Sequence, residues 1–451
     1  MLIVIKILAF LFAIFILVLV HEFGHFWVAR RCGIKILKFS IGFGKALFTW
    51  YGKDGTQYIL AAVPLGGYVK MLDTRETEVS AHERKFAFDY RPIWQRFLVV
   101  LTGPVVNLLF AFLVFWLLFV IGVTTPKPVI GKITPNSIAS QAGLSRDMEI
   151  VAVDGKNVTD WQKVVLAVFS KIGDRGNLIV KTAAGSAASH NHFLDIDNWK
   201  LDSFQPDPLL ALGITPYHPI APAVIGKVMP KSPAAIFGLL PNDRVISVNN
   251  QRVTDWEELI EQIKKYPQQQ IALLISRDGK FLPLTMTTDW KFDAGWKKIG
   301  YLGVGSLPIK WSKENLLEQR YLPLQAIVPA LSQTWLLIDF NGTALVKLVT
   351  GKISFHVLGG PITIFQSAAA ALNAGIVVYF GFLAILSIML AFVNLLPIPG
   401  LDGGHILFLG IEALLRRPIS VRTQVLVFRL GLILLILIMV QATINDLMRI
   451  F

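Results

Sequence analysis

Two histidines and a glutamate stand within five residues near the N-terminus, as His21-Glu22-Phe23-Gly24-His25. On an α-helix, residues four apart lie on nearly the same face about one turn apart, so His21 and His25 can present ring nitrogens to one ion. Zinc accepts such nitrogens and, in catalytic sites, keeps one coordination position for water. Glu22 then suits the general base that deprotonates this water. The pattern predicts metal-assisted hydrolysis.

The surroundings of this pentapeptide are unusually apolar. Every residue from 7 to 20 is apolar, so a helix that would cross a bilayer runs directly into the motif. Ionisable side chains at membrane depth are costly and are by default functional, so three of them within five residues call for a partner such as a divalent cation. The alternative, a chance match on a solvated helix, does not fit such surroundings.

A third metal ligand is available in the C-terminal half. The segment 394–405, NLLPIPGLDGGH, follows directly on another apolar run, and its prolines and glycines break the helix and leave Asp402 at membrane depth. An unpaired carboxylate there would cost about 2.5–3.5 kcal/mol on insertion scales, so a metal partner is the economical explanation. His405 is the rival ligand. Its other possible roles are to support the site or to cap the following helix.

The composition indicates a membrane protein that carries soluble modules. Of 451 residues, 54% are hydrophobic and 16% are charged, which is too apolar for an ordinary soluble multidomain protein. Four stretches are long enough to span a bilayer, at about 7–29, 97–123, 375–396 and 424–444. A fifth, 326–349, is interrupted by polar residues and is predicted to be amphipathic and interfacial. A fifth span is the alternative.

Basic residues predict the orientation of these spans. Arg30 and Arg31 follow the first span and Arg416 and Arg417 follow the third, whereas only Lys6 precedes the first. Because positive loops stay on the cytoplasmic side, both termini and the long segment between the second and third spans are expected outside. The net charge of +13 is then explained largely by basic loops beside anionic lipid. No nucleic-acid partner is expected.

The segment between the second and third spans contains a tandem duplication. VIGK occurs at 129–132 and again at 224–227, and VTDW occurs at 158–161 and again at 253–256. Each copy is predicted to form a short strand, a Gly-Leu loop with a helix, alternating strands and an amphipathic helix. This order resembles circularly permuted PDZ domains, which capture extended peptides or chain ends at a sheet edge. The alternative is that the copies only exclude bulky substrates.

A β-hairpin is predicted between the first and second spans. Residues 46–51 and 57–63 are expected to form strands around a glycine-containing turn, with IGFG at 41–44 and PLGG at 64–67 flanking them. A substrate helix must unwind before cleavage, and such strands could pair with it. A plain cytoplasmic hairpin is the alternative. Asn107, in the second span, is expected to orient the site, to bind a substrate backbone or to join helices.

HEFGH at 21–25, GPVVN at 103–107 and NLLPIP followed by LDG at 394–403 resemble the site-2 protease family of intramembrane zinc metalloproteases, peptidase family M50. With the two PDZ-like copies, the resemblance covers essentially the whole chain and is closest to bacterial members with tandem PDZ domains. It implies one Zn²⁺ per chain, with His21, His25 and Asp402 as ligands and Glu22 as catalytic base.

The same resemblance implies where a substrate would lie. It points to a membrane-reentrant β-structure at the predicted hairpin and to a substrate-contacting segment beside the metal. The candidate substrate-binding residues are Asn394, Pro397, Pro399, Gly42, Gly44 and Asn107.

The expected fold is a polytopic α-helical membrane protein with four transmembrane helices, a membrane-associated β-hairpin and two inserted α+β PDZ-like domains. The N-terminal membrane region is expected at 1–127 and the two PDZ-like domains at 128–221 and 222–312. An amphipathic interfacial segment at 313–374 and a C-terminal membrane region at 375–451 complete the chain.

The resemblance implies an intramembrane zinc endopeptidase of the bacterial inner membrane. It would cleave single-span membrane proteins, such as anti-sigma factors or remnant signal peptides, in regulated intramembrane proteolysis of the envelope stress response. The PDZ-like domains would be periplasmic, and the active site would lie near the cytoplasmic face. The alternatives are a non-catalytic PDZ membrane adaptor that retains a metal site, and a zinc transporter.

Overall fold

The computed structural model describes residues 2–75, 78–183, 189–201, 207–292, 297–307, 311–417 and 419–450. The chain divides into two compact units. The first, here called the membrane unit, contains Met1–Thr124 and Glu318–Asp446. The second, here called the repeat unit, contains Thr125–Leu317 together with Leu447–Phe451. The repeat unit is therefore inserted, in sequence, between two segments of the membrane unit.

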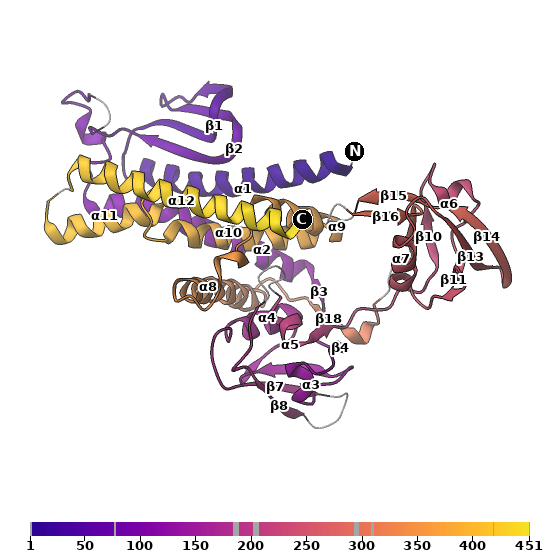
Figure 1. The fold of residues 1–451 in the computed structure, drawn as a ribbon. Coiled ribbons are helices and arrows are strands. Elements are labelled where there is room, and N and C mark those ends of the chain that lie inside the picture. The colour runs from indigo at the N-terminus through magenta and orange to yellow at the C-terminus, as the bar shows by residue number, and fades with distance from the viewer. Residues whose placement is uncertain are drawn as a thin grey trace. The chain divides into compact units, whose positions relative to one another are not determined.

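Within the described residues, four helices are long and apolar enough to cross a membrane. They are α1 (Leu2–Arg31), α2 (Ile93–Ile121), α10 (Ile376–Leu395) and α12 (Val421–Ile450). These helices correspond to the four spans predicted from the sequence, with ends that differ by a few residues. Both α1 and α10 pack against α2 (Figure 1). The chain is thus a membrane protein by the length and composition of its helices.

Among the described residues, the membrane unit contains three further α-helices: α8 (Ile327–Val349), α9 (Pro361–Ala374) and α11 (Asp402–Leu415). The segment predicted to be amphipathic forms α8, which runs through Pro329 without a break because this proline lies in the first turn, where its missing N–H is not needed. Val328 and Trp335 are exposed on α8, whereas Thr334 and Leu337 are buried. The helix thus exposes large apolar side chains, and its amphipathic, interfacial character stays a prediction.

The helices of the membrane unit bury several polar side chains and expose many large apolar ones. Asn107 and Ser387 are fully buried, and the Ser387 hydroxyl donates to the Asn107 carbonyl oxygen at 2.8 Å between α10 and α2. Leu8 and Leu437, on α1 and α12, are 59% and 60% exposed. Lipid accepts such an apolar exterior, while interhelical hydrogen bonds satisfy the polar interior.

The hairpin consists of β1 (Ile36–Tyr51) and β2 (Gln57–Met71), which are longer than predicted. Ser40 pairs with both Ile59 and Tyr68, so the two strands bend and double back into four short rows of residues. The prediction that 41–44 and 64–67 flank the strands is wrong, because both glycine-containing segments lie inside them. Gly42 has φ of 92°, and glycine tolerates this bend where other residues are strained.

The repeat unit contains two four-stranded antiparallel sheets with the same strand order, β6-β5-β7-β8 and β12-β11-β13-β14. The strands of the first are β5 (Glu149–Val153), β6 (Lys156–Asn157), β7 (Asn177–Ala183) and β8 (His190–Asp195). Those of the second are β11 (Arg244–Val248), β12 (Gln251–Arg252), β13 (Gln270–Arg277) and β14 (Lys280–Thr287). The two copies recognised in the sequence thus form matching sheets.

Matching helices accompany these sheets. The VTDW segments precede α4 (Trp161–Phe169) and α7 (Trp256–Lys264), and the aspartate of each caps its helix. Asp160 accepts a hydrogen bond from the Lys163 backbone N–H, as Asp255 does from that of Glu258. Side chains of this kind satisfy the free N–H groups at a helix start. The repeated motif is therefore explained by local capping.

The remaining elements of the repeat unit pair or connect these cores. In the first copy they are β4 (Ile130–Ile133), α3 (Ile138–Gln141), α5 (Pro208–Leu212) and β9 (Ile214–Pro216). In the second they are β10 (Ile225–Val228), α6 (Pro233–Ile236), β15 (Asp289–Phe292), β16 (Lys298–Tyr301) and β17 (Val304–Ser306). The strands β3 (Val123–Pro126) and β18 (Leu316–Gln319) pair where the chain passes between the units.

Candidate metal centre

The residues of the HEFGH motif lie on α1, as the helical spacing predicts. His21, Glu22 and His25 are each 8% exposed, although they are among the most polar side chains of the membrane unit. The Nε2 atoms of the two histidines are 3.2 Å apart, and their rings are nearly perpendicular. One turn of helix therefore brings two imidazole nitrogens to the same point.

Asp402 reaches this point from the other end of the chain. The helix α10 ends at Leu395, and Asp402 is the first residue of α11. Its Oδ2 atom lies 3.1 Å from His21 Nε2 and 3.4 Å from His25 Nε2. Among the described residues, these three side chains form a group whose donor atoms all lie within 4.8 Å of one another.

The three donor atoms fit a bound zinc ion. Tetrahedral zinc with bonds of about 2.0–2.2 Å separates its ligand atoms by about 3.3–3.6 Å, close to the separations found here. The Oδ2 atom of Asp402 is buried and, within the described part of the chain, has no hydrogen-bond partner of good geometry despite its two imidazole neighbours. A divalent cation between the three atoms would satisfy all of them.

Two groups on α2 set the orientation of both rings. His25 Nδ1 donates to the Val99 carbonyl oxygen at 2.8 Å, which leaves Nε2 with a free lone pair. Asn107 Nδ2 lies 3.3 Å from His21 Nδ1, while its buried oxygen has no partner among the described residues. With the Asn107 amide turned over, this oxygen accepts a hydrogen bond from His21 Nδ1–H, which leaves Nε2 free in the same way.

A glycine that the sequence reasoning did not single out makes room for both rings. A Cβ atom on Gly103 of α2 would lie 2.3 Å from His25 Nε2 and 2.9 Å from His21 Cε1. Only glycine lets the backbone of α2 come this close to the imidazoles. The available signal was the Gly-Pro pair inside an apolar helix, at the start of the GPVVN segment.

A second glycine brings the hairpin against the motif. A Cβ atom on Gly67 of β2 would lie 2.8 Å from Glu22 Cγ and 2.7 Å from the Ser40 carbonyl oxygen. The predicted residues Gly42 and Gly44 instead lie at the bend of β1, where their φ angles are 92° and 85°. The strand row that touches the glutamate is therefore the one that contains Gly67. Two successive glycines within a strand were the sequence signal for close backbone approach.

The predicted substrate segment lies directly beside the three donor atoms. Asn394 is in the last turn of α10, and its Nδ2 lies 3.5 Å from His21 Nε2. Pro397 and Pro399 lie in the connection to α11, and a Cβ on Gly431 of α12 would lie 1.9 Å from the Pro399 carbonyl oxygen. This connection is thus closely packed between α11 and α12.

His405 does not cap α11. The helix begins at Asp402, so His405 lies within its first turn, and its backbone N–H donates to the Leu401 carbonyl oxygen at 3.3 Å. The residue before the helix is Leu401, which makes no side-chain cap. The capping alternative is wrong because the glycines after Asp402 are helical rather than extended.

A model of peptidase family M50 matches residues 9–438. The chain belongs to peptidase family M50. It is 42% identical over 441 residues to the regulator of sigma-E protease of Salmonella typhimurium and 41% identical over 441 residues to that of Escherichia coli, with 98% of each chain covered. A Vibrio cholerae protein named as a zinc metalloprotease is 39% identical over 443 residues, again with 98% of both covered.

Membership of family M50 makes the chain a zinc metalloprotease, and its four apolar helices make it a membrane protein. Among solved structures, the HtrA-type protease AlgW with a decapeptide covers 29% of this chain and 42% of its own, at 20% identity and a TM-score of 0.14. That likeness is too low to support an argument about the fold.

Proposed function

We propose that His21, His25 and Asp402 hold one zinc ion and that Glu22 is the catalytic base of an intramembrane endopeptidase. One observation carries this proposal: two imidazole nitrogens of α1 and a carboxylate oxygen of α11 converge within 3.4 Å, and the oxygen lacks a good hydrogen bond among the described residues. The residues come from positions far apart in the sequence. A salt bridge with a purely structural role would require neither two histidines on one carboxylate nor a buried glutamate beside them.

In this proposal, each residue of the site has its own role in peptide hydrolysis. Zinc, when bound, would activate a water molecule and polarise the scissile carbonyl. Glu22, next in sequence to His21 and buried beside it, accepts a proton from the water and delivers it to the leaving amine. Asn107 and the Val99 carbonyl hold the imidazoles in the tautomer that leaves Nε2 free. Asn394 is placed to donate to the substrate backbone beside the site.

The hairpin supplies a place for an unwound substrate. The strand row with Gly67 lies against Glu22, and a substrate segment that adds to this sheet edge would lie across the donor atoms. Its backbone groups would exchange helical hydrogen bonds for those of the sheet, which is essential where water is scarce. Gly42 and Gly44 permit the bend of β1, and Pro397 and Pro399 lie in the connection from α10 to Asp402.

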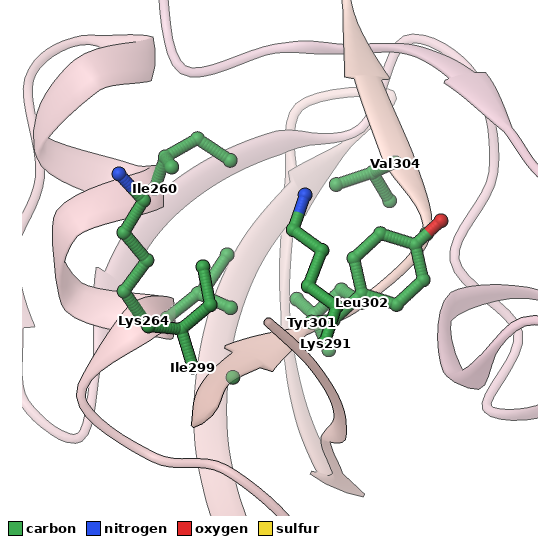
Figure 2. Close-up of a pocket in the computed structure, with 10 residues that line it drawn as sticks. Ile260, Lys264, Lys291, Ile299, Tyr301, Leu302 and Val304 are labelled. Atoms are coloured by element: carbon green, nitrogen blue, oxygen red, sulfur yellow. The ribbon is translucent and has the colours of Figure 1, made fainter. Parts of the chain in front are cut away.

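The two copies in the repeat unit are PDZ-like domains in this proposal, at 128–221 and 222–312. Figure 2 shows a pocket in the second copy, between α7 and the segment from Ile299 to Val304. Ile260, Lys264 and Lys291 are among the side chains that line it. An apolar floor with cationic neighbours suits an extended peptide with a free carboxylate. A size filter that excludes untrimmed substrates is the second role we consider.

The relatives that bear the name regulator of sigma-E protease indicate the physiological setting. We propose the same setting for this chain: the bacterial inner membrane, with the repeat unit periplasmic and the metal near the cytoplasmic face. Single-span membrane proteins, such as an anti-sigma factor or a remnant signal peptide, would be the substrates. The regions at 1–127, 313–374 and 375–451 would form the membrane-associated part.

The decisive variant is Glu22→Gln. It removes the base but keeps all three proposed zinc ligands, so we expect normal zinc content together with a loss of cleavage of at least about 100-fold. Purified protein in detergent with a single-span model substrate gives the cleavage rate, and atomic absorption gives the zinc. Wild-type turnover in this variant would refute the proposed base.

Asp402→Ala separates the protease from a non-catalytic adaptor. Loss of zinc and of the cellular phenotype together is expected of the enzyme. An adaptor would keep its phenotype and its partner binding in this variant, because its function would not depend on the metal.

A further inference from the structure

A cluster of four charged side chains lies near the N-terminal end of α2. It takes no direct part in the proposed chemistry. Arg96 of α2 and Glu412 of α11 form a two-point ion pair, with Nη1 to Oε2 at 3.1 Å and Nη2 to Oε1 at 2.6 Å. Their side chains are 8% and 16% exposed. Such fork geometry fixes both distance and orientation. The pair therefore joins two helices at one defined place.

A second ion pair, between Asp73 and Arg75, extends the cluster to the hairpin. Asp73 and Arg75 follow β2, and Arg75 Nε donates to Asp73 Oδ1 at 2.8 Å. Burial raises the pKa of Asp73, but hydrogen bonds from Arg75 and the charge of Arg96 together hold it below its ordinary value. Arg75 Nη1 also lies 3.5 Å from Gln424 Oε1 of α12. The two acids and two bases thus link the hairpin, α2, α11 and α12.

The position of α11 determines where Asp402 lies. Asp402 begins this helix and Glu412 comes ten residues later, about 15 Å along the axis. On α2, Arg96 lies seven residues, or about 10 Å, before Gly103, where an added Cβ atom would meet both imidazoles. The ion pair therefore ties the far part of α11 to the same helix against which the histidines rest.

The other end of α11 is held by backbone packing. A Cβ on Gly403 would lie 2.1 Å from the Leu396 carbonyl oxygen, and one on Gly404 would lie 2.5 Å from that of Ile398. The glycine contacts at the start of α11 and the ion pair in its later part together define the tilt of the helix. With the ion pair removed, α11 keeps its glycine contacts and its packing on α2 but loses the two-point contact that fixes its far end, so it is freer to tilt. Such a tilt moves the carboxylate that must stay within 3.4 Å of the two imidazoles.

We propose that the Arg96–Glu412 ion pair positions Asp402 for metal binding by holding α11 on α2, and that Asp73 and Arg75 couple this position to the hairpin. Arg96 and Glu412 are positioning residues, since neither touches the metal residues. The inference rests on the proposed role of Asp402 as a zinc ligand. Buried ion pairs specify geometry more reliably than they add stability, because desolvation offsets much of their attraction.

The test compares Glu412→Gln, which removes the charge and keeps the shape, with the exchanged pair Arg96→Glu/Glu412→Arg. Full-length protein in detergent is titrated with zinc against a competing chelator, and kcat and KM are measured on one single-span substrate. We expect roughly tenfold weaker zinc binding and a lower kcat at similar KM for Glu412→Gln, as for other groups that orient a ligand. The exchanged pair should recover most of both losses.

Glu83→Gln is the matched control, because it neutralises an exposed ion pair with Lys35, whose atoms are 2.6 Å apart. It should leave zinc affinity and kcat unchanged. If Glu412→Gln does not fold, Glu412→Asp retains the charge on a shorter side chain and should weaken zinc binding by a smaller factor.

A merely structural pair would lower the unfolding temperature without changing zinc affinity or kcat of the folded protein, and that result would overturn the proposal. So would an exchanged pair that recovers nothing. If the wild-type protein binds zinc but cleaves no substrate, the proposed protease function fails while the zinc titrations still decide the positioning role.

Discussion

Among the described residues, the membrane unit buries more polar and charged side chains than the repeat unit does. In the membrane unit, His21, His25 and Arg96 are buried, whereas large apolar residues such as Leu437 face outward. In the repeat unit, the side chains buried most completely are aliphatic, among them Ile271 and Ile275. The repeat unit gains stability by taking apolar surface out of water. The membrane unit cannot, because lipid is as apolar as its own interior.

This difference indicates where each unit can accept change. In the membrane unit, polar contacts and close backbone approach at glycines hold the helices in register, so the functional residues are also the residues that organise the packing. In the repeat unit, the charged side chains that line the pocket, Lys264 and Lys291, lie outside the apolar core. Substitutions in the first unit should therefore affect chemistry most, and those in the second should affect stability or binding.

The largest effect is expected for Gly103→Val. A branched side chain at this position must displace both imidazoles, because even a Cβ would lie 2.3 Å from His25 Nε2. A misplacement of about 1 Å already costs about 100-fold in rate, so we expect a larger loss of cleavage together with loss of zinc. Cleavage assays and metal analysis on the purified protein measure this.

Gly410→Ala is the control for that variant. A Cβ there meets no atom within 4 Å, and alanine favours a helix by about 0.5–1 kcal/mol over glycine. Activity and zinc content should be unchanged. Normal zinc binding in Gly103→Val would contradict the account of α2 as the support for the histidines.

An intermediate effect is expected when one large apolar side chain in each unit is replaced by alanine. Ile275→Ala in the second copy should lower its free energy of unfolding by about 2–5 kcal/mol, because it leaves a cavity in a core sealed from water. Leu437→Ala, on the exterior of α12, should cost less than about 1 kcal/mol, since lipid replaces the lost contacts. Denaturant titration followed by limited proteolysis of the full chain reports each unit. Equal costs would remove the distinction between an apolar core sealed from water and an apolar exterior that faces lipid.

The smallest effect is expected at the pocket of the second copy. Lys264→Glu reverses a charge beside the pocket in Figure 2 and should weaken binding of a labelled peptide with an apolar last residue and free carboxylate by about threefold to tenfold. Lys265→Glu, one residue further and outside the pocket lining, is the matched control. Fluorescence anisotropy measures both. An equal loss for the two variants would show that only the overall charge matters.

The two copies also differ in the segment that borders this pocket in the second copy. The glycines Gly213 and Gly303 are equivalent, since a Cβ on either would lie 2.2 Å from the Cβ of the serine that caps α3 or α6. Before Gly213 the chain forms α5, which packs on α4 and buries Leu209, whereas before Gly303 it forms strand β16 beside α7. The first copy therefore presents a different surface, and we expect peptide binding by the second.

Features that depend on neighbouring residues were predictable from the sequence. Apolar runs of sufficient length predicted the four spanning helices, and the repeated VIGK and VTDW segments predicted two like domains. The i, i+4 spacing of His21 and His25 placed both rings on one face of α1. The predicted hairpin was too short, because its glycine bends resembled strand ends and the doubling back of β1 and β2 depends on pairing between distant residues.

The sequence alone established the local patterns of this protein: which segments cross a membrane, which segment is repeated, and which helix turn carries two histidines and a glutamate. The close approach of Gly103 to the imidazoles, of Gly67 to Glu22 and of Arg96 to Glu412 became known only from the folded chain. The physical reason is that periodicity reports the face of one helix or strand. Distances between atoms of separate elements depend instead on how those elements pack, and here glycine contacts and buried charges decide that packing.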